Sequence, residues 1–484
     1  MVQQQPQHFL LVTFPAQGHI NPALQLAKRL TRTGALVTFA TAISAHRRMF
    51  SSSSPAIDNR DDEHQQAPLL SFSPYSDGYD GGFNPDKDDT AHYMSQIKIV
   101  GFETLTGVAL SLADQGRPVT CIVYTLLLPW VADVARELGV PSVLFWIQPA
   151  TVFSAYYHYF HGFADLISSH NKEPWFTVEL PGMPPLRIRD LPSFLLSSDT
   201  SEYYFALLCF EEMYQTLDRE VEENKKGSLQ RKIKVLMNTF DELEHEQLAA
   251  VDTMELIPIG PLLPSAYTDE KDKMDTAFGG DLLEPDVREG YMEWLDAKPE
   301  GSVVYVSFGS MSVLPARQRE EISRALFESG RPYLWVVRGN REGVEEGAEG
   351  KLVEWCSQVE VLSHRAVGCF VTHCGWNSTV ESLACGVPMV GFPQCTDQPT
   401  NARLAEAVWG VGVRAEVDVN GLLVAAELRR CLDVVMVEGE RGAAIRRNAA
   451  AWREKALEAV REGGSSDRNL KAFVKDINKN QQYI

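Results

Sequence analysis

Cysteine, basic charge and long apolar runs are all scarce in this sequence. Only 8 of its 484 residues are cysteines, and no two of them form a Cys-x-x-Cys pair. Several of these cysteines lie inside apolar runs, as reduced thiols in a protein core do. The cysteine usage therefore argues against a disulfide framework and predicts a reducing compartment.

Basic residues are outnumbered by acidic ones, 45 to 65, which gives a formal net charge of −20. A surface with this excess repels nucleic acid and anionic membranes at long range. We therefore expect neither as a partner, and any phosphate that the protein binds must be held by a local site.

No apolar run is long enough to cross a membrane. The most apolar stretch, residues 121–132, contains Thr125 and Pro129 and stops at Asp133, well short of the roughly 20 residues that a spanning helix needs. The N-terminus has neither the basic region nor the apolar core of a signal peptide. We expect a cytoplasmic protein, without a membrane span, that is a monomer.

The chain consists mainly of short β-rich apolar runs that alternate with longer amphipathic stretches, which is the pattern of a parallel sheet covered by helices. Since 484 residues are too many for one ordinary core, we expect two α/β domains. The candidate elements of the first domain are residues 8–14, 21–31, 36–40, 120–124, 129–138 and 141–146. Those of the second are residues 303–308, 320–328, 333–337, 368–372, 380–385, 387–392 and 428–437, followed by helices at 441–461 and 468–477.

The strongest local signal is the turn between a buried strand at residues 368–372 and a helix at 379–385. Unpaired backbone N–H groups and the positive end of the helix dipole bind phosphate at such a turn. Gly375 permits close approach of the backbone, and His373 and Ser378 add hydrogen-bond donors. Ser378 and Glu381 also match the capping box Ser-x-x-Glu, so the spacing alone is equally compatible with a structural cap.

A wider pattern favours the phosphate site. The 44 residues at 355–398, from Trp355 to Gln398, resemble the signature of plant secondary-metabolite UDP-glycosyltransferases. The resemblance extends to residues 14–22 and 306–310, and the motif at 124–130 is similar to the subgroup of anthocyanin 5-O-glucosyltransferases and carboxylate-glucosylating relatives. It implies the GT-B fold, in which two Rossmann-like domains face each other across a cleft.

The resemblance also implies domain boundaries. These are an acceptor-binding domain at residues 1–262, a linker at 263–288, a UDP-sugar-binding domain at 289–458, and a C-terminal helix at 459–484 that crosses back to the first domain. The stacked prolines after residue 258 and the polar run at 268–281 are typical of such a linker.

Each donor-site residue takes its role from the resemblance. Those expected at the uracil and ribose are Trp355, the backbone of Cys356, Gln358 and Glu381. Those expected at the diphosphate are Ser310, His373, Asn377 and Ser378, beside Gly375 of the turn, and those at the sugar are Trp376, Asp397 and Gln398. A glutamine at the last position favours UDP-glucose as the donor.

His19 is the candidate general base. It follows the first strand, at the start of a helix that Pro22 is expected to open, and a helix N-terminus favours the neutral, proton-accepting imidazole. A lone histidine in a turn is more often structural, but the resemblance at this position favours catalysis. His19 would take the acceptor proton while the acceptor oxygen displaces UDP, with inversion at the anomeric carbon.

Thr125 occupies the position at which many members of the family have an aspartate that orients the histidine. A threonine can hydrogen-bond an imidazole but cannot stabilise an imidazolium by charge. Two hypotheses follow: another carboxylate or a water replaces the aspartate, or the acceptor is acidic enough to need little base catalysis. A carboxylic acid with a pKa near 4 is already ionised at neutral pH.

No metal or bound cofactor is expected. The Asp-x-Asp sequence at residues 86–88 stands in a polar loop with no strand to position it, so we interpret it as solvated charge. A nicotinamide dehydrogenase is disfavoured because Gly410 and Gly412 lack the third glycine and the preceding strand of a dinucleotide motif. The remaining alternative is a non-catalytic UDP-sugar or metabolite-binding protein, against which His19 argues.

The acceptor is not encoded in a readable motif. Residues 51–89 and 153–198, which would shape its pocket, are predicted to be irregular loops. Five aromatic residues could line an apolar pocket, although their helical spacing fits core packing as well. They are Tyr156, Tyr157, Tyr159, Phe160 and Phe163.

Overall fold

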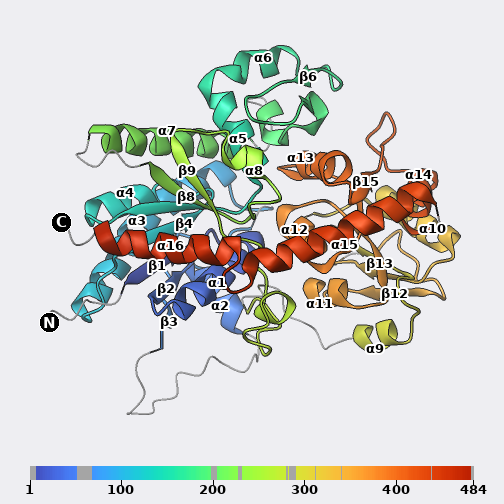
Figure 1. The fold of residues 1–484 in the computed structure, drawn as a ribbon, viewed down its shortest axis with the longest axis horizontal. Coiled ribbons are helices and arrows are strands. Elements are labelled where there is room, and N and C mark those ends of the chain that lie inside the picture. The colour runs from blue at the N-terminus through green and yellow to red at the C-terminus, as the bar shows by residue number, and fades with distance from the viewer. Residues whose placement is uncertain are drawn as a thin grey trace.

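The computed structural model describes residues 7–51, 68–84, 86–197, 204–226, 232–279, 282, 290–310, 312–339, 341–437 and 439–480. Within them the chain forms two parallel sheets, each packed between helices, that lie side by side (Figure 1). Within the described ranges, no helix has the length and apolar character that a membrane crossing requires.

The first sheet has seven strands in the order β3-β2-β1-β4-β5-β8-β9. The strands are β1 (His8–Val12), β2 (Leu36–Ala40), β3 (Leu70–Phe72), β4 (Cys121–Thr125), β5 (Ser142–Trp146), β8 (Ile233–Met237) and β9 (Met254–Pro258). The helices are α1 (Gln17–Arg32), α2 (Ile43–Ser51), α3 (Thr90–Asp114), α4 (Val131–Glu137), α5 (Ala150–His158), α6 (Ala164–Ser169), α7 (Tyr204–Lys226) and α8 (His245–Leu248). A two-stranded hairpin, β6 (Thr177–Val178) and β7 (Leu186–Arg187), stands apart from the sheet.

The second sheet has six strands in the order β12-β11-β10-β13-β14-β15. They are β10 (Val303–Ser307), β11 (Tyr333–Val336), β12 (Gly350–Val353), β13 (Val367–Thr372), β14 (Met389–Gly391) and β15 (Gly412–Arg414). The helices are α9 (Tyr291–Asp296), α10 (Ala316–Ser329), α11 (Gln358–Ser363), α12 (Trp376–Cys385), α13 (Gln398–Arg403), α14 (Ala425–Met436), α15 (Glu440–Val460) and α16 (Ser465–Asn480).

The central strands are buried along their whole length, as all five residues of β1, β4 and β10 show. A parallel strand with helices on both faces needs apolar side chains in both directions, so it is an unbroken apolar run in the sequence. These runs are the elements that the sequence predicted most closely.

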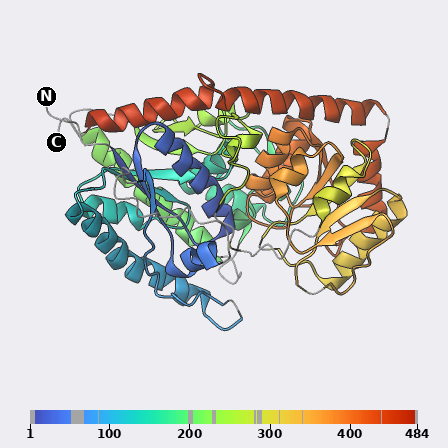
Figure 2. The same cartoon turned by 90° about the horizontal axis from the view of Figure 1, so that it is seen from below.

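The last two helices tie the domains together. α15 lies along the second domain and α16 along the first, and together they follow one edge of the molecule (Figure 2). α16 inserts Phe473 into the core of the first domain, where its ring centroid is 6.0 Å from that of Phe9. The helix that crosses back therefore begins at Ser465, after the turn at Gly463.

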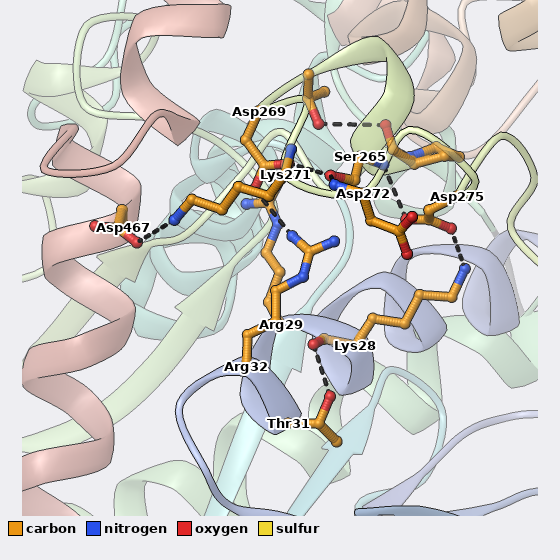
Figure 3. A network of polar contacts seen from close by, with 12 residues as sticks. Lys28, Arg29, Thr31, Arg32, Ser265, Asp269, Lys271, Asp272, Asp275 and Asp467 are labelled. Carbon is orange, nitrogen blue, oxygen red and sulfur yellow. Dashed lines mark hydrogen bonds and ion pairs between the residues drawn. The ribbon is translucent and has the colours of Figure 1, made fainter.

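The predicted linker is packed on the first domain over its described part, residues 263–279. Figure 3 shows its acidic side chains against the basic end of α1: Asp269 pairs with Arg32 at 2.9 Å, and Asp275 pairs with Lys28. These carboxylates complement the cations of α1, so the described part of the predicted linker is held against the first domain. Residues 280–281 and 283–288 of the predicted linker lie outside the described residues.

Two expectations about loops also need correction. The range 153–198 is not irregular throughout, because α5 and α6 continue through its first part. Tyr156 is 1% exposed, and its ring stacks on Phe210 at a centroid distance of 4.3 Å, so it belongs to the core. Of the range 51–89, residues 52–67 and 85 lie outside the described residues, and the rest contains β3.

The long helix α3 was not expected. Its buried side chains recur about every four residues, at Tyr93, Ile97, Gly101, Leu105 and Ala109. This stripe is narrow and includes a glycine, where an added Cβ would lie 2.8 Å from the Trp130 ring. Such small residues give a weak hydrophobic signal in the sequence although they pack closely in the fold.

Candidate active site

The turn after β1 and the turn after β13 meet between the two domains. The side-chain amide of Asn377, in the first turn of α12, donates a hydrogen bond to the Gly18 carbonyl at 2.9 Å. Both turns stand at the carboxyl ends of parallel strands, where ligands of such folds bind. The site is therefore built from both domains.

The helix after β13 begins earlier than expected, at Trp376, with Gly375 as its N-cap and no side chain capping it. The capping-box alternative is thus wrong, because Ser378 lies inside the first turn instead of preceding it. Its hydroxyl accepts from Gln358 Nε2 at 2.9 Å. The first backbone N–H groups of α12 have no capping side chain and can bind an anion.

The His373 side chain packs against Gly309 and Gly375, where a larger residue would collide with its ring. A Cβ added to Gly309 would lie 2.6 Å from His373 Nε2, and one added to Gly375 would lie 2.5 Å from it. Gly309 also has a φ of +77°, a conformation that other residues avoid. Burial lowers the pKa of His373 to about 4, with a further contribution from Arg338. The neutral ring can donate one hydrogen bond to a ligand at the turn.

At the other side of the turn, Gln358 links two side chains expected at the donor. Its Nε2 donates to Glu381 Oε2 at 2.5 Å as well as to Ser378, and its Oε1 accepts from the Tyr305 hydroxyl at 3.3 Å. Burial raises the pKa of Glu381 to about 7, partly offset by the bond from Gln358. Glu381 is thus a buried carboxyl that titrates near neutral pH and can accept two hydroxyl donors.

The remaining residues expected at the uracil and the phosphates lie shortly after the ends of strands. Trp355 and Cys356 come two and three residues after β12, and Ser310 comes three residues after β10. Trp355 is half-buried and Ser310 is exposed, whereas Cys356 is buried, with its Sγ 3.3 Å from the Tyr305 hydroxyl. This placement leaves the Trp355 ring and the backbone of Cys356 at the carboxyl edge of the second sheet.

The residues expected at the sugar are held firmly. The Trp376 indole donates to the Asn238 carbonyl at 2.7 Å and packs near Trp409, so its ring is an interdomain contact. Asp397 accepts from Asn401 Nδ2 at 2.6 Å. Gln398 accepts from the backbone N–H groups of Gln394 and Cys395 at 2.8 and 3.1 Å.

His19 belongs to the first domain and is half-buried, with Thr125 as its polar partner. Thr125 Oγ1 is 3.0 Å from His19 Nδ1 and accepts from the Phe14 N–H at 3.2 Å. Within the described residues no carboxylate lies within 4.0 Å of the imidazole. Burial lowers the pKa of His19 to about 3. Desolvation thus favours the neutral imidazole, the form that the sequence also predicted.

Pro22 lies inside α1, because the helix begins at Gln17 and not at Pro22 as expected. A proline has no N–H, so the carbonyl four residues earlier loses its helical donor. That carbonyl belongs to Gly18, the residue before His19, and it accepts from Asn377 instead. The proline thus frees the acceptor that joins the two turns.

Arg338 was missed by the sequence analysis. It follows β11 by two residues, between the strand ends that carry Ser310 and Trp355. Its Nε and Nη1 are buried with no hydrogen-bond partner, and its charge contributes to the lowered pKa of His373. Buried N–H donors without an acceptor are costly. The available signal was an arginine two residues after a buried apolar strand, at the carboxyl edge of the sheet.

Asp86 and Asp88 are not positioned as a metal site by any strand. Asp88 Oδ2 accepts from the Asn84 N–H at 2.8 Å, within the loop itself. No group of three or more His, Cys, Asp or Glu side chains with metal-binding geometry occurs among the residues that the structure describes.

Comparison with known proteins gives consistent matches. Residues 177–440 match the protein family described as UDP-glucoronosyl and UDP-glucosyl transferase. The chain is 49% identical to crocetin glucosyltransferase, chloroplastic, from Gardenia jasminoides, over 100% of this chain and 99% of that protein. It is 48% identical to anthocyanidin 3-O-glucoside 5-O-glucosyltransferase 1 from Perilla frutescens, over 97% and 98% of the two chains.

Solved structures match the whole molecule. Os79 from O. sativa in complex with UDP superposes with a TM-score of 0.82 at 33% identity, covering 97% of this chain and 100% of that one. The GT-B fold expected from the sequence is confirmed.

Proposed function

The chain belongs to the family of UDP-glucoronosyl and UDP-glucosyl transferases, and from this premise we propose what it transfers and how. It is a UDP-glucose-dependent glucosyltransferase that acts by inversion, without a metal ion. Its acceptor is a small plant secondary metabolite, and the group glucosylated is already acidic: a carboxylate or an acidic phenol.

The proposed binding of the UDP-sugar donor follows from the turn before α12. The uncapped N–H groups of the helix, neutral His373 and the unpaired Arg338 supply donors and positive charge for a diphosphate. Charge that develops on the leaving UDP is then balanced by the protein. This arrangement supports a reaction that needs no metal, and retention of full activity in excess chelator is the corresponding test.

The proposed catalytic step depends on His19. With a hydroxyl acceptor, His19 Nε2 takes the hydroxyl proton, the oxygen forms a bond to the anomeric carbon, and the bond from that carbon to the UDP oxygen breaks. One displacement inverts the anomeric centre. The anomeric proton coupling of the product, measured by NMR, tests inversion.

The acceptor class rests on one observation, the contact between His19 and Thr125. An imidazole whose pKa is lowered to about 3, next to an uncharged hydroxyl, is a weak base. It is poorly suited to remove the proton of an alcohol, whereas a carboxylate needs no base. Of the relatives, one is named for crocetin and another for the 5-O position of an anthocyanidin glucoside; both names are compatible with an acidic acceptor.

The decisive experiment compares a phenol and a carboxylic acid as acceptors for His19→Ala. We expect the phenol rate to fall by about 10²- to 10⁴-fold, the usual contribution of a general base, and the carboxylate rate to fall by less than about tenfold. The exposed His245→Ala serves as the control for loss of a histidine. Equal losses on both acceptors contradict the acidic-acceptor proposal.

The alternative of a non-catalytic UDP-sugar-binding protein makes a different prediction. Such a protein binds UDP-glucose but releases no UDP with any acceptor. Release of UDP by the wild-type protein in the presence of an acceptor, together with the glucosylated product, excludes it.

We also propose that the protein is a cytoplasmic monomer. All eight cysteines are unpaired, which supports a reducing compartment. A fluorescent fusion of the protein that is found in plastids contradicts the cytoplasmic location. The molar mass from light scattering coupled to gel filtration tests whether the protein is a monomer.

A further inference from the structure

A segment of the first domain reaches across to the second domain beside the expected sugar site. This crossing segment, residues 186–196, comprises β7 and two short 3-10 turns, η2 (Ile188–Asp190) and η3 (Ser193–Leu196). It lies against α13 of the second domain, where the hydroxyl of Thr400 donates to the Asp190 carbonyl at 2.7 Å, and it also contacts Arg414 of β15.

A buried ion pair fixes the crossing segment in place. Asp190 is 3% exposed, and its carboxylate lies 2.7 Å from Arg414 Nη1 and 3.8 Å from Arg403 Nε. Buried charges have one favourable arrangement, because a displaced partner leaves the other uncompensated. The ion pair therefore favours the observed position of the segment against β15 and α13.

A reciprocal pair of hydrogen bonds joins the same segment to the loop before α13. The Ser193 N–H donates to the Thr396 carbonyl at 2.8 Å, and the Thr396 N–H donates to Ser193 Oγ at 2.7 Å. Thr396 has a φ of +60°, a conformation that a β-branched residue rarely adopts. Such a conformation persists only where surrounding contacts impose it, and Ser193 supplies two of them.

Thr396 directly precedes the two residues expected at the sugar. Its hydroxyl donates to Asp397 Oδ1 at 2.8 Å. Asp397 in turn accepts from Asn401, whose Nδ2 also donates to the Cys374 carbonyl in the turn before α12 at 2.8 Å. A continuous set of contacts thus runs from Ser193 of the first domain to the sugar residues and the donor turn of the second.

We propose that the crossing segment sets the choice of donor sugar, with Ser193 and Asp190 as positioning residues. They act through Thr396 and α13, which place Asp397 and Gln398. The proposal rests on the proposed function, in which these two residues contact glucose. Glucose and galactose differ only in the direction of one hydroxyl, so discrimination depends on the position of the hydrogen-bonding groups to within a fraction of an ångström.

The test is Ser193→Ala, which keeps the Ser193 N–H but leaves the Thr396 N–H without its acceptor. We expect the ratio of kcat/KM for UDP-glucose to that for UDP-galactose to fall at least tenfold, with a raised KM for UDP-glucose. The dissociation constant of UDP, which has no sugar, is expected to stay within about twofold of wild type. Ser193→Thr retains the hydroxyl and is expected to retain selectivity.

The matched control is Glu416→Gln. Glu416 pairs with Arg189 of the crossing segment at 2.9 Å, but it is 56% exposed on its side chain, and exposed pairs contribute little. We expect the control to leave the sugar ratio unchanged. Asp190→Asn is expected to act in the same direction as Ser193→Ala; should it fail to fold, the serine variants decide alone.

An unchanged sugar ratio in Ser193→Ala overturns the proposal. So does an equal loss of affinity for UDP and UDP-glucose, because it indicates general disturbance of the second domain. If the wild-type protein binds UDP-glucose but does not transfer glucose, the proposed function is contradicted instead. The effect of Ser193→Ala on sugar selectivity is then measured as the ratio of the dissociation constants for UDP-glucose and UDP-galactose.

Discussion

The side-chain amide of Asn377 donates a hydrogen bond to the backbone carbonyl of Gly18, at 2.9 Å, across the boundary between the domains. Asn377 belongs to α12, the helix proposed to bind the donor, and Gly18 precedes His19, the proposed base. The bond exists because Pro22 leaves that carbonyl without a helical donor. The position of the base is thereby linked to the position of the donor helix.

Replacing Pro22 with alanine tests this link. An alanine N–H can bond to the Gly18 carbonyl within α1 and compete with Asn377. We expect kcat to fall at least severalfold while the free energy of unfolding stays level or rises, because proline is the poorest residue in a helix interior. Steady-state kinetics and urea unfolding measure both; a kcat equal to that of wild type contradicts the link.

Replacing Thr125 with aspartate places a carboxylate beside His19. It is expected to raise the pKa of His19 from about 3, because a nearby negative charge stabilises the imidazolium. A base acts above its pKa, so the acid limb of the pH-rate profile moves to higher pH. The rate on weakly acidic phenols rises about tenfold, and that on carboxylates does not. Thr125→Asn, which adds no charge, is the control; equal gains in both variants contradict the explanation.

Binding of UDP is expected to release a proton from Glu381. The pKa of the free group is raised to about 7, and ribose hydroxyls that donate to the carboxylate lower it in the complex. UDP affinity therefore weakens as the pH falls below about 7. Calorimetry at pH 6.5 in buffers of different ionisation enthalpy measures the release. The Glu381→Gln variant measures the proton release that comes from the phosphate of UDP itself. If this variant releases as many protons as wild type, the assignment of the release to Glu381 is refuted.

Replacing Arg338 with methionine distinguishes a role of this side chain in stability from a role in UDP binding. Methionine fills a similar volume and removes a cation whose Nε and Nη1 are buried without partners. We expect the ligand-free variant to be at least as stable as wild type, since replacing a buried charge by an apolar side chain is often neutral or stabilising. UDP affinity is expected to fall at least tenfold. Lower stability together with unchanged affinity would show a structural role instead.

Phe473→Ala tests the attachment of the C-terminal helix. Phe473 is 1% exposed and lies in the core of the first domain, so its truncation is expected to cost about 3–5 kcal/mol of unfolding free energy. Val419→Ala, at a fully exposed position, is the control. A loss below about 1 kcal/mol means that α16 is not held through this side chain.

Several features follow from the sequence alone because their signal is contiguous. Buried parallel strands such as β1 and β10 are unbroken apolar runs, and the strand, turn and helix around Gly375 carry their glycine and polar residues within a few positions. Element boundaries are less accurate. α12 starts three residues before the expected position, since backbone geometry at Gly375 decides it, and α1 includes Pro22 because a proline is tolerated where its lost hydrogen bond is replaced.

Only the tertiary structure decides what lies next to these local elements. The contacts of His19 with Thr125, Asn377 with Gly18 and Ser193 with Thr396 join positions that are 106, 359 and 203 residues apart. The sequence encodes the hydrogen-bonding capacity of each side chain, but not the partner that folding brings within 3 Å. The sequence thus determined the expected donor chemistry and two α/β domains, while chain packing decided the burial of His19, the unpartnered Nε and Nη1 of Arg338 and the contacts that hold Asp397 and Gln398.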